Sequence, residues 1–265
     1  MTAIALTIAG SDSSGGAGIQ ADLKTFAALG VYGASAITAL TAQNTRGVSA
    51  IHDVPPAFIA AQLDAVFSDL TIGAVKIGML SQPAAIEAVA DALARHQAKN
   101  IVLDPVIAAT SGHRLLAPAA LAVLRHRLIP RALLLTPNLP EAAALLDASP
   151  AQNEREMEEQ ARRLLALGPA AVLIKGGHAG GDESVDLLVE ANTVTRFAAK
   201  RIVTAHTHGT GCTLSSAIAA GLAKGLDLAA AVRAGKAYVT AAIAAADRLA
   251  IGSGHGPVHH FHAWW

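Results

Sequence analysis

The sequence predicts an α/β fold, specifically a three-layer α/β/α sandwich around a mostly parallel central sheet. Short, continuously apolar runs rich in β-branched residues alternate along the chain with longer stretches rich in alanine and leucine, which is the pattern of repeated βαβ units. Strands that are apolar at every position are typical of parallel sheets covered by helices on both faces. The 265 residues are 52% hydrophobic, so we expect one domain, residues 1–265, with a large core.

Five short runs are the predicted strands, and each adjoins a helical stretch. They span residues 4–9, 74–77, 101–103, 133–136 and 172–174. Residues 182–197 alternate in polarity on either side of Asn192, which predicts a hairpin.

Helix starts are marked by three local signals. Pro55 and Pro56 precede the stretch 57–69, Ser81 is followed by Pro83, and Asn153 is followed three residues later by Glu156, as in a capping box. Two further helices, at about residues 210–222 and 228–249, are expected to close the domain.

Composition argues against several classes of partner and location. Twenty basic and twenty acidic residues cancel, whereas a nucleic-acid binder usually carries a basic excess. The single cysteine excludes an internal disulfide and a CxxC metal site, which fits the reducing cytoplasm. The N-terminus lacks a basic region, and the apolar stretch 229–250 contains four charged residues, so we expect neither a signal peptide nor a membrane helix.

In α/β sheets of this type, ligands bind beyond the carboxyl ends of the strands, so the loops after the predicted strands are candidate sites. The loop 10–18 (GSDSSGGAG) offers glycines for close backbone approach and Asp12 as a polar group, although a flexible turn explains it equally well. The GxGxxA pattern at 16–21 lies too far beyond its strand for a Rossmann site. Leu23 stands where a Walker loop over 18–25 would require glycine.

Two more loops offer oxygen ligands. Asp104 directly follows the predicted strand 101–103, where its carboxylate could hold a cation, and this loop continues through Thr110 to Gly112. Asn138 and Glu141 stand at the start of a helix, where roles as N-cap and helix-dipole partner account for them without any ligand.

The fourth loop predicts phosphate binding. Gly209, Thr210 and Gly211 open a long helix, whose free N–H groups and positive dipole end favour an anion. Lys175, at another strand end, adds a cation. Together they predict a phosphoryl-transfer site without a Walker loop.

Cys212 lies in the first turn of that helix. The helix N-terminus lowers a thiol pKa and a neighbouring polyphosphate raises it, so the sequence leaves its ionisation open, and an inert packing role is the simpler alternative. His259, His260 and His262 could chelate adventitious metal but are more simply a polar tail.

Eight motifs, in order along nearly the whole chain, closely resemble the hydroxymethylpyrimidine/phosphomethylpyrimidine kinases of thiamine biosynthesis, which belong to the ribokinase-like superfamily. The motifs are residues 10–33 (GSDSSGGAGIQADLKTFAALGVYG), 41–45 (TAQNT), 75–80 (VKIGML), 104–106 (DPV), 136–142 (TPNLPEA), 174–178 (IKGGH), 208–220 (HGTGCTLSSAIAA) and 254–261 (GHGPVHHF). The resemblance implies phosphorylation of 4-amino-5-hydroxymethyl-2-methylpyrimidine by ATP and Mg²⁺, then of the monophosphate to the diphosphate. It also implies one site for both steps and a homodimer, and leaves monovalent-cation dependence open.

The resemblance further implies roles for individual residues. On the pyrimidine side these are Gln43 as the hydrogen-bonding partner of the ring, Met79 and Val106 as apolar walls, and Gly10, Asp12 and Asp22 near the substrate. On the nucleotide side they are Lys175, Asn138, Thr210 and Gly211 as ATP-binding residues, Asp104 and Glu141 as the magnesium carboxylates, and Gly209, Thr210 and Gly211 as the anion hole. Cys212 stands where sugar-kinase relatives have an aspartate base. The loop after Val106 departs from many relatives by running Ile107-Ala-Ala-Thr110.

Two alternatives remain at this point. A pyridoxal/pyridoxine kinase shares the fold and phosphorylates a hydroxymethyl group on a similar ring. A pyrimidine-binding sensor without catalysis is the alternative outside the enzymes, and the presence of Lys175 and of the glycines at 209 and 211 argues against it.

Overall fold

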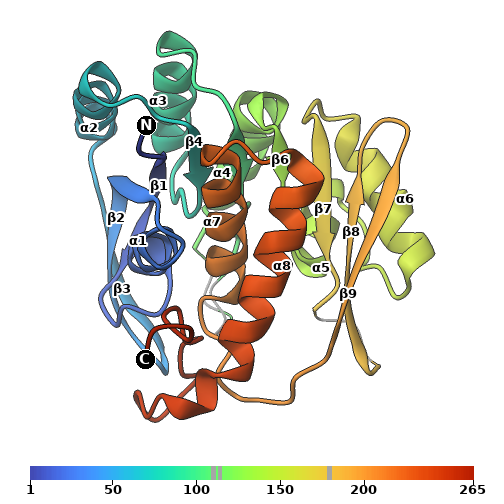
Figure 1. The fold of residues 1–265 in the computed structure, drawn as a ribbon. Helices are drawn as coiled ribbons and strands as arrows, with labels where there is room; N and C mark the ends of the chain where they lie inside the picture. Colours follow the sequence, from blue (N-terminus) through green and yellow to red (C-terminus); the bar gives the residue numbers. More distant parts are fainter. Residues whose placement is uncertain (109–111, 113–114, 178–180) are drawn as a thin grey trace.

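The structure is a computed structural model that describes residues 1–108, 112, 115–177 and 181–265. Within them, nine strands form one sheet in the order β3-β2-β1-β4-β5-β6-β7-β8-β9 (Figure 1). The strands are β1 (Ile4–Asp12), β2 (Tyr32–Asn44), β3 (Gly47–Asp53), β4 (Ala74–Ile77), β5 (Ile101–Leu103), β6 (Leu134–Leu135), β7 (Ala171–Lys175), β8 (Glu183–Val189) and β9 (Val194–Lys200). The strands β2, β1, β4, β5, β6 and β7 pair in parallel. At the two ends of the sheet, β3 pairs antiparallel with β2, β8 with β7, and β9 with β8.

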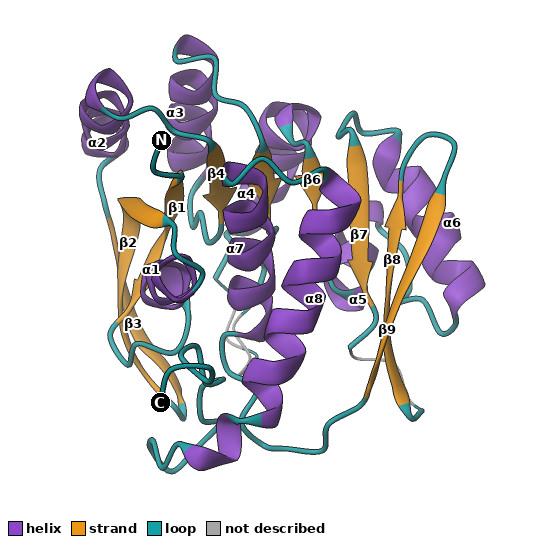
Figure 2. Cartoon of the chain, viewed as in Figure 1, coloured by secondary structure: helices purple, strands orange, loops and turns teal. Residues whose placement is uncertain are grey.

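Helices cover both faces of the sheet (Figure 2), which confirms the predicted three-layer arrangement. One face is covered by α1 (Gly18–Ala28), α7 (Thr210–Ala223) and α8 (Leu228–Ala244). The other is covered by α2 (Pro56–Asp69), α3 (Pro83–Arg95), α4 (Pro118–Val123), α5 (Leu139–Leu146) and α6 (Glu154–Leu165). A short π-helix (Leu124–Leu128) and 3-10 turns (Ile129–Arg131, Ala246–Arg248) complete the described helices.

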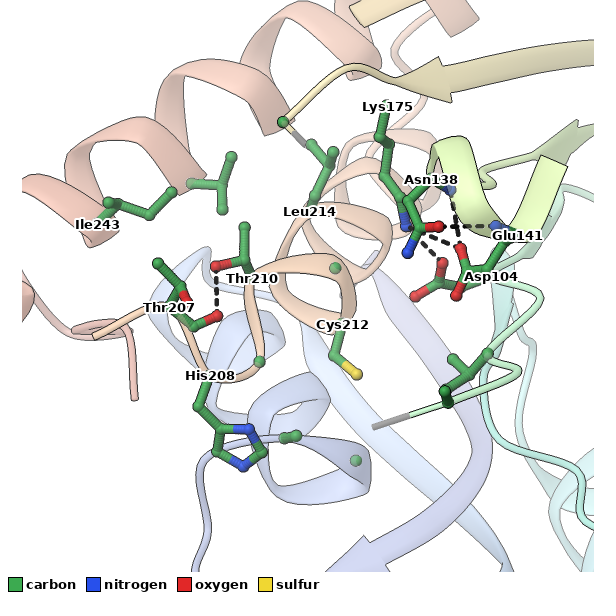
Figure 3. A pocket seen from close by; sticks show the side chains of 18 of the residues that line it. Asp104, Asn138, Glu141, Lys175, Thr207, His208, Thr210, Cys212, Leu214 and Ile243 are labelled. Atoms are coloured by element: carbon green, nitrogen blue, oxygen red, sulfur yellow. Dashed lines mark hydrogen bonds and ion pairs between the residues drawn. The ribbon is translucent and has the colours of Figure 1, made fainter. Parts of the chain in front are cut away.

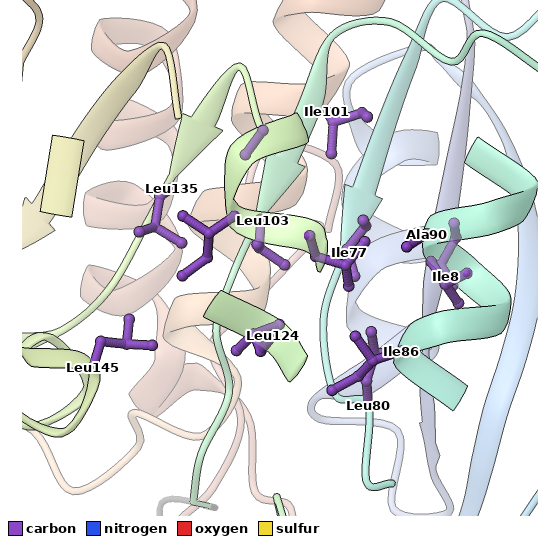
Figure 4. Close-up of a cluster of buried hydrophobic side chains, with 14 of the residues drawn as sticks. Ile8, Ile77, Leu80, Ile86, Ala90, Ile101, Leu103, Leu124, Leu135 and Leu145 are labelled. Carbon is purple, nitrogen blue, oxygen red and sulfur yellow. The ribbon is translucent and has the colours of Figure 1, made fainter. Parts of the chain in front are cut away.

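The central strands divide their side chains between the two layers. Ile77 and Leu103 point into the core beneath α3 and α4 (Figure 4), whereas Ala74 and Val102 belong to the core beneath α7. Successive side chains of a strand point to opposite faces, so a central strand needs apolar residues at every position. This is why the predicted strands 74–77 and 101–103 coincide with β4 and β5.

The sequence prediction missed β2 and β3. β2 is interrupted by small and polar residues, and its exposed positions include Tyr32 and Leu40, while β3 at the sheet edge has no fully buried residue. Neither strand shows the continuous apolar pattern of the central strands. The predicted hairpin is confirmed as β8 and β9.

Two predicted helix ends are refined by the structure. The Asn153 side chain caps α6 by accepting from the Glu156 N–H, but the Glu156 carboxylate accepts from the Gln152 N–H and the Asn153 side chain. The last long helix ends at Ala244 instead of residue 249.

α8 together with the turn after it, Leu228–Arg248, is long and apolar enough to cross a membrane by length and composition alone. In the fold its buried side, which includes Val232, Gly235 and Val239, packs on α7. It therefore serves here as one of the three helices that cover the sheet.

Candidate active site

A cavity of about 640 Å³ lies at the edge where the parallel strands end. Its walls come from the carboxyl ends of β1, β2, β4, β5 and β7, from the first turns of α5 and α7, and from α8 (Figure 3). This is the edge at which ligands bind in open α/β sheets, and the cavity volume is that of a small-molecule site.

One side of the cavity carries a cluster of buried charges. The Lys175 Nζ, at the end of β7, lies 2.8 Å from the Asp104 Oδ1 after β5 and 4.0 Å from the Glu141 Oε2 on α5 (Figure 3). Burial alone would lower the pKa of Lys175, but the Asp104 and Glu141 carboxylates outweigh burial and raise it. Lys175 is therefore a firmly charged cation facing the cavity.

Glu141 has a different charge balance. Burial raises its pKa to about 7, with Lys175 opposing and Asp104 reinforcing the shift. Its Oε2 accepts from the Asn138 N–H while its own N–H donates to the Asn138 Oδ1, at 2.8 and 2.9 Å. These reciprocal bonds form a capping box, so the predicted cap and dipole roles are confirmed at two residues that also line the cavity.

The first turn of α7 faces this charge cluster. Gly209 is its N-cap with a φ of +80°, a conformation that glycine adopts without strain. A Cβ on Gly211 would lie 3.3 Å from the Lys175 Nζ and 3.5 Å from the Asp104 Oδ2. The helix N-terminus and the lysine therefore converge on one region, where an anion would meet both.

The opposite side of the cavity is built around Asp12, the last residue of β1. Its carboxylate accepts hydrogen bonds from the N–H groups of Ser14, Gly16 and Ala17, from the Ser14 hydroxyl and from the His208 Nε2. Burial raises the pKa of Asp12, but the bonds from His208 and Ser14 outweigh burial and lower it to about 2. Asp12 is thus an anion that shapes the loop between β1 and α1.

Gln43, near the end of β2, is held by that loop. Ser13 and Gln43 exchange hydrogen bonds through the serine hydroxyl and the glutamine backbone, at 2.8 and 2.9 Å. The Gln43 Oε1 accepts from the Thr41 hydroxyl at 3.1 Å. The side-chain amide is therefore presented to the cavity in a fixed orientation.

Cys212 lies between the two sides, and its sulfur points into the cavity (Figure 3). Burial raises the pKa of the Cys212 thiol to about 11, with Lys76 opposing the shift and Asp22 and Asp104 adding to it. Burial and the two carboxylates therefore outweigh the Lys76 ammonium, and this favours a neutral thiol near pH 7.

The family model for phosphomethylpyrimidine kinase matches residues 12–259 of the chain. A hydroxymethylpyrimidine/phosphomethylpyrimidine kinase of Rhizobium meliloti is 61% identical over 265 residues, covering 100% of this chain and 99% of the relative. The chain belongs to the phosphomethylpyrimidine kinase family.

Two further matches are a second relative in sequence and a solved structure. A kinase of the same description from Escherichia coli is 58% identical over 261 residues, covering 98% of both chains. The Bacillus subtilis pyridoxal kinase, solved as an ADP complex, is 37% identical with a TM-score of 0.91, covering 99% of each chain. The phosphomethylpyrimidine kinase family thus shares its fold with a pyridoxal kinase.

The structure brings together nearly all the residues to which the family resemblance gives a role. Those that line the cavity are Gly10, Asp12, Gln43, Met79, Asp104, Val106, Asn138, Glu141, Lys175, Gly209, Thr210, Gly211 and Cys212. Their roles toward substrate and nucleotide stay predictions. Thr110, Ser111 and His178, in loops that the sequence singled out, lie outside the described residues.

Asp22 is the exception, and the structure corrects its expected place beside the substrate. Its side chain is fully buried on α1 and does not line the cavity. One carboxylate oxygen accepts from the Lys76 Nζ at 2.8 Å and from the Thr7 hydroxyl at 2.6 Å, and the other from the Ser216 hydroxyl at 2.7 Å. Asp22 is the counter-ion of a lysine that does line the cavity.

Two lysines of the cavity were not identified from the sequence as site residues. Lys76 stands alone among the apolar residues of β4, and Lys236 stands on the largely apolar α8, where its Nζ donates to the Asp186 Oδ2 at 2.7 Å. Lys76 falls in the motif 75–80 but received no role, and a charge in a largely apolar element occurs in buried pairs as well as at functional sites.

We expect Asp22→Asn to reduce the free energy of unfolding by about 3–5 kcal/mol, because it leaves the Lys76 ammonium buried without a counter-ion. Urea unfolding would measure this loss. Asp64→Asn, which removes an exposed carboxylate paired with Arg95, is the matched control and should cost less than about 1 kcal/mol. If Asp22→Asn left the free energy of unfolding unchanged and weakened pyrimidine binding, Asp22 would act beside the substrate, as the sequence predicts.

Proposed function

We propose that this chain phosphorylates 4-amino-5-hydroxymethyl-2-methylpyrimidine with ATP, and then phosphorylates the monophosphate to the diphosphate, as a thiamine biosynthesis kinase. The observation that carries the proposal is that one cavity has the Gln43 amide at one side and the start of α7 with Lys175 at the other. Membership of the phosphomethylpyrimidine kinase family supports the same activity.

Gln43 is the proposed selector for the aminopyrimidine ring. A primary amide both donates and accepts hydrogen bonds, which matches a ring nitrogen next to an exocyclic amino group. Met79 and Val106 line the same cavity and would contact the faces of the ring. This arrangement directs the hydroxymethyl group of the substrate toward Cys212 and α7.

Lys175 and the first turn of α7 are the proposed phosphate-binding groups, with Asn138 contacting the nucleotide. Phosphoryl transfer requires positioning of the reactants and stabilisation of charge rather than covalent participation of the protein. A lysine and helical N–H groups that converge on one region provide both without rearrangement during the reaction.

Asp104 and Glu141 are the proposed magnesium carboxylates. Mg²⁺ in nucleotide sites is held by one or two carboxylates together with phosphate oxygens and water, and these two buried carboxylates face the cavity beside Lys175. They fit that donor set. When bound, the ion would neutralise the charge of the transferred phosphoryl group.

The thiolate form of Cys212 is the proposed proton acceptor for the hydroxymethyl group. Its sulfur faces the cavity beside the anion-binding turn. The ammonium of Lys76 favours its ionised form, although burial outweighs this effect. Cytoplasmic location, expected from the single cysteine, and a homodimer, implied by the family resemblance, complete the proposal.

A kinase assay over a panel of pyrimidine and pyridine alcohols tests the function. We expect the highest kcat/KM for the hydroxymethylpyrimidine, with turnover of its monophosphate by the same preparation. The Bacillus subtilis pyridoxal kinase has the same fold at a TM-score of 0.91, so pyridoxal is the competing substrate. Preference for pyridoxal would replace the proposal with the vitamin B6 alternative, and binding without turnover would support a pyrimidine sensor.

Gln43→Ala should raise the dissociation constant of the pyrimidine while leaving ATP affinity unchanged. The ring atoms that lose their partner cost about 1–3 kcal/mol of binding free energy. Calorimetry with each ligand separately measures both effects. Unchanged pyrimidine affinity would remove Gln43 from the ring site.

Cys212→Ala should lower kcat by about 10²-fold to 10⁴-fold, the usual contribution of a general base. Because burial raises the thiol pKa to about 11, the thiolate fraction, and with it the wild-type rate, should still be rising above pH 9, while the Cys212→Ala rate should stay flat. Rate profiles at saturating substrate measure this difference. Turnover of Cys212→Ser close to wild type would reduce Cys212 to a packing residue.

A further inference from the structure

His208 joins the two sides of the cavity. It directly precedes the N-cap of α7, and its Nε2 lies 2.8 Å from the Asp12 Oδ2, with both side chains almost fully buried. Its backbone N–H donates to the Gly256 carbonyl and its carbonyl accepts from the Val258 N–H. The residue is therefore fixed at both its backbone and its ring.

The two segments that His208 joins, the loop after β1 and the turn that begins α7, are tightly packed against each other. A Cβ on Gly16 would overlap the His208 ring, and a Cβ on Gly209 would overlap the Gly16 carbonyl oxygen. The loop after β1 and the phosphate-binding turn of α7 therefore lie in direct contact. A shift of one loop must displace the other, because close-packed groups transmit displacement.

The Asp12 contact also fixes the His208 proton. A carboxylate can only accept, so the histidine Nε2 carries the hydrogen in this contact whatever the charge of the ring. The Gln43 Nε2 lies 3.5 Å from that same nitrogen. Two N–H donors cannot bond to each other, so His208 offers Gln43 no acceptor. No other residue that the structure describes accepts from the Gln43 Nε2, which leaves its NH₂ available to a ligand.

We propose that His208 is a positioning residue that, through Asp12, sets the distance between the pyrimidine-binding side and the phosphate-binding turn and keeps the Gln43 amide free for the ring. The inference rests on the proposed function, since Gln43 is the proposed ring-binding residue. His208 acts through Asp12 and Gln43 and takes no part in phosphoryl transfer.

The test compares two substitutions at position 208. His208→Gln can place an amide nitrogen near the original Nε2 and keep the donor to Asp12, whereas His208→Leu keeps bulk without a donor. We expect His208→Leu to raise the KM for the hydroxymethylpyrimidine and to lower kcat, each by roughly 10-fold or more. His208→Gln should recover most of both losses, and the dissociation constant of a non-hydrolysable ATP analogue should change little in either variant.

His206→Gln is the matched control. His206 lies on the same loop as His208, and its Nδ1 accepts from the Gly256 N–H. The variant therefore alters a contact between this loop and the C-terminal segment and leaves the His208–Asp12 contact intact. It should leave kcat and KM near wild type.

Asp12→Asn changes the other partner of the His208–Asp12 contact. Adding His208→Leu to Asp12→Asn should cause little further loss of activity, since both changes remove the same interaction.

The outcomes separate the inference from the function on which it rests. Wild-type protein that turns over no pyrimidine would overturn the proposed function itself. With an active wild type, three results would overturn the role of His208. The first is that KM and kcat of His208→Leu stay within about 3-fold of wild type, and the second is that His208→Gln loses as much activity as His208→Leu. The third is that the losses of Asp12→Asn and His208→Leu add fully in the double variant.

Discussion

The parallel pairing of six strands determines where every functional group of this protein can lie. Parallel strands all end at one edge of their sheet, and each is followed by a loop that must return through a helix. The last residues of β1 and β7, Asp12 and Lys175, and the first residue after β5, Asp104, therefore reach the same cavity although they are far apart in sequence. Apolar side chains beneath both helical layers hold these strand ends in register.

Buried charge pairs then fix the groups within the cavity. Three of them surround it in the described part of the chain, Lys76 with Asp22, Lys175 with Asp104 and Lys236 with Asp186, and a hydrogen bond joins His208 to Asp12. Buried pairs add little net stability because both ions lose their water, but removal of one partner is strongly unfavourable. Each pair therefore keeps a cation or anion at a defined position at the strand ends.

The sequence predicts the central strands and most of the residues that line the cavity. It does not predict the edge strand β3, nor the partners of the residues that line the cavity, such as Asp22. Residues 74–77 and 101–103 are apolar at every position because both faces of β4 and β5 are buried. β3 is exposed along much of its length, so no hydrophobic pattern marks it. The motif that contains Asp22 is recognisable in sequence, but only the packing of α1 against β4 shows that its carboxylate faces Lys76 and not the cavity. His208 likewise begins the recognised motif 208–220, but nothing in the sequence pairs it with Asp12, which is 196 residues away.

The pairing of Lys175 with Asp104 fits the proposed phosphoryl transfer. In the structure the lysine lies between the Asp104 and Glu141 carboxylates, the two groups proposed to hold magnesium. A nucleotide polyphosphate and its cation bring charges of both signs. With the proposed ligands bound, phosphate would replace a carboxylate as the partner of the lysine, and Asp104 and Glu141 would hold the metal ion in place of the lysine. Each buried charge keeps an opposite partner through this exchange, which avoids the large cost of an isolated ion. The proposed phosphate and magnesium groups would therefore bind a nucleotide without leaving any of these buried charges unpaired.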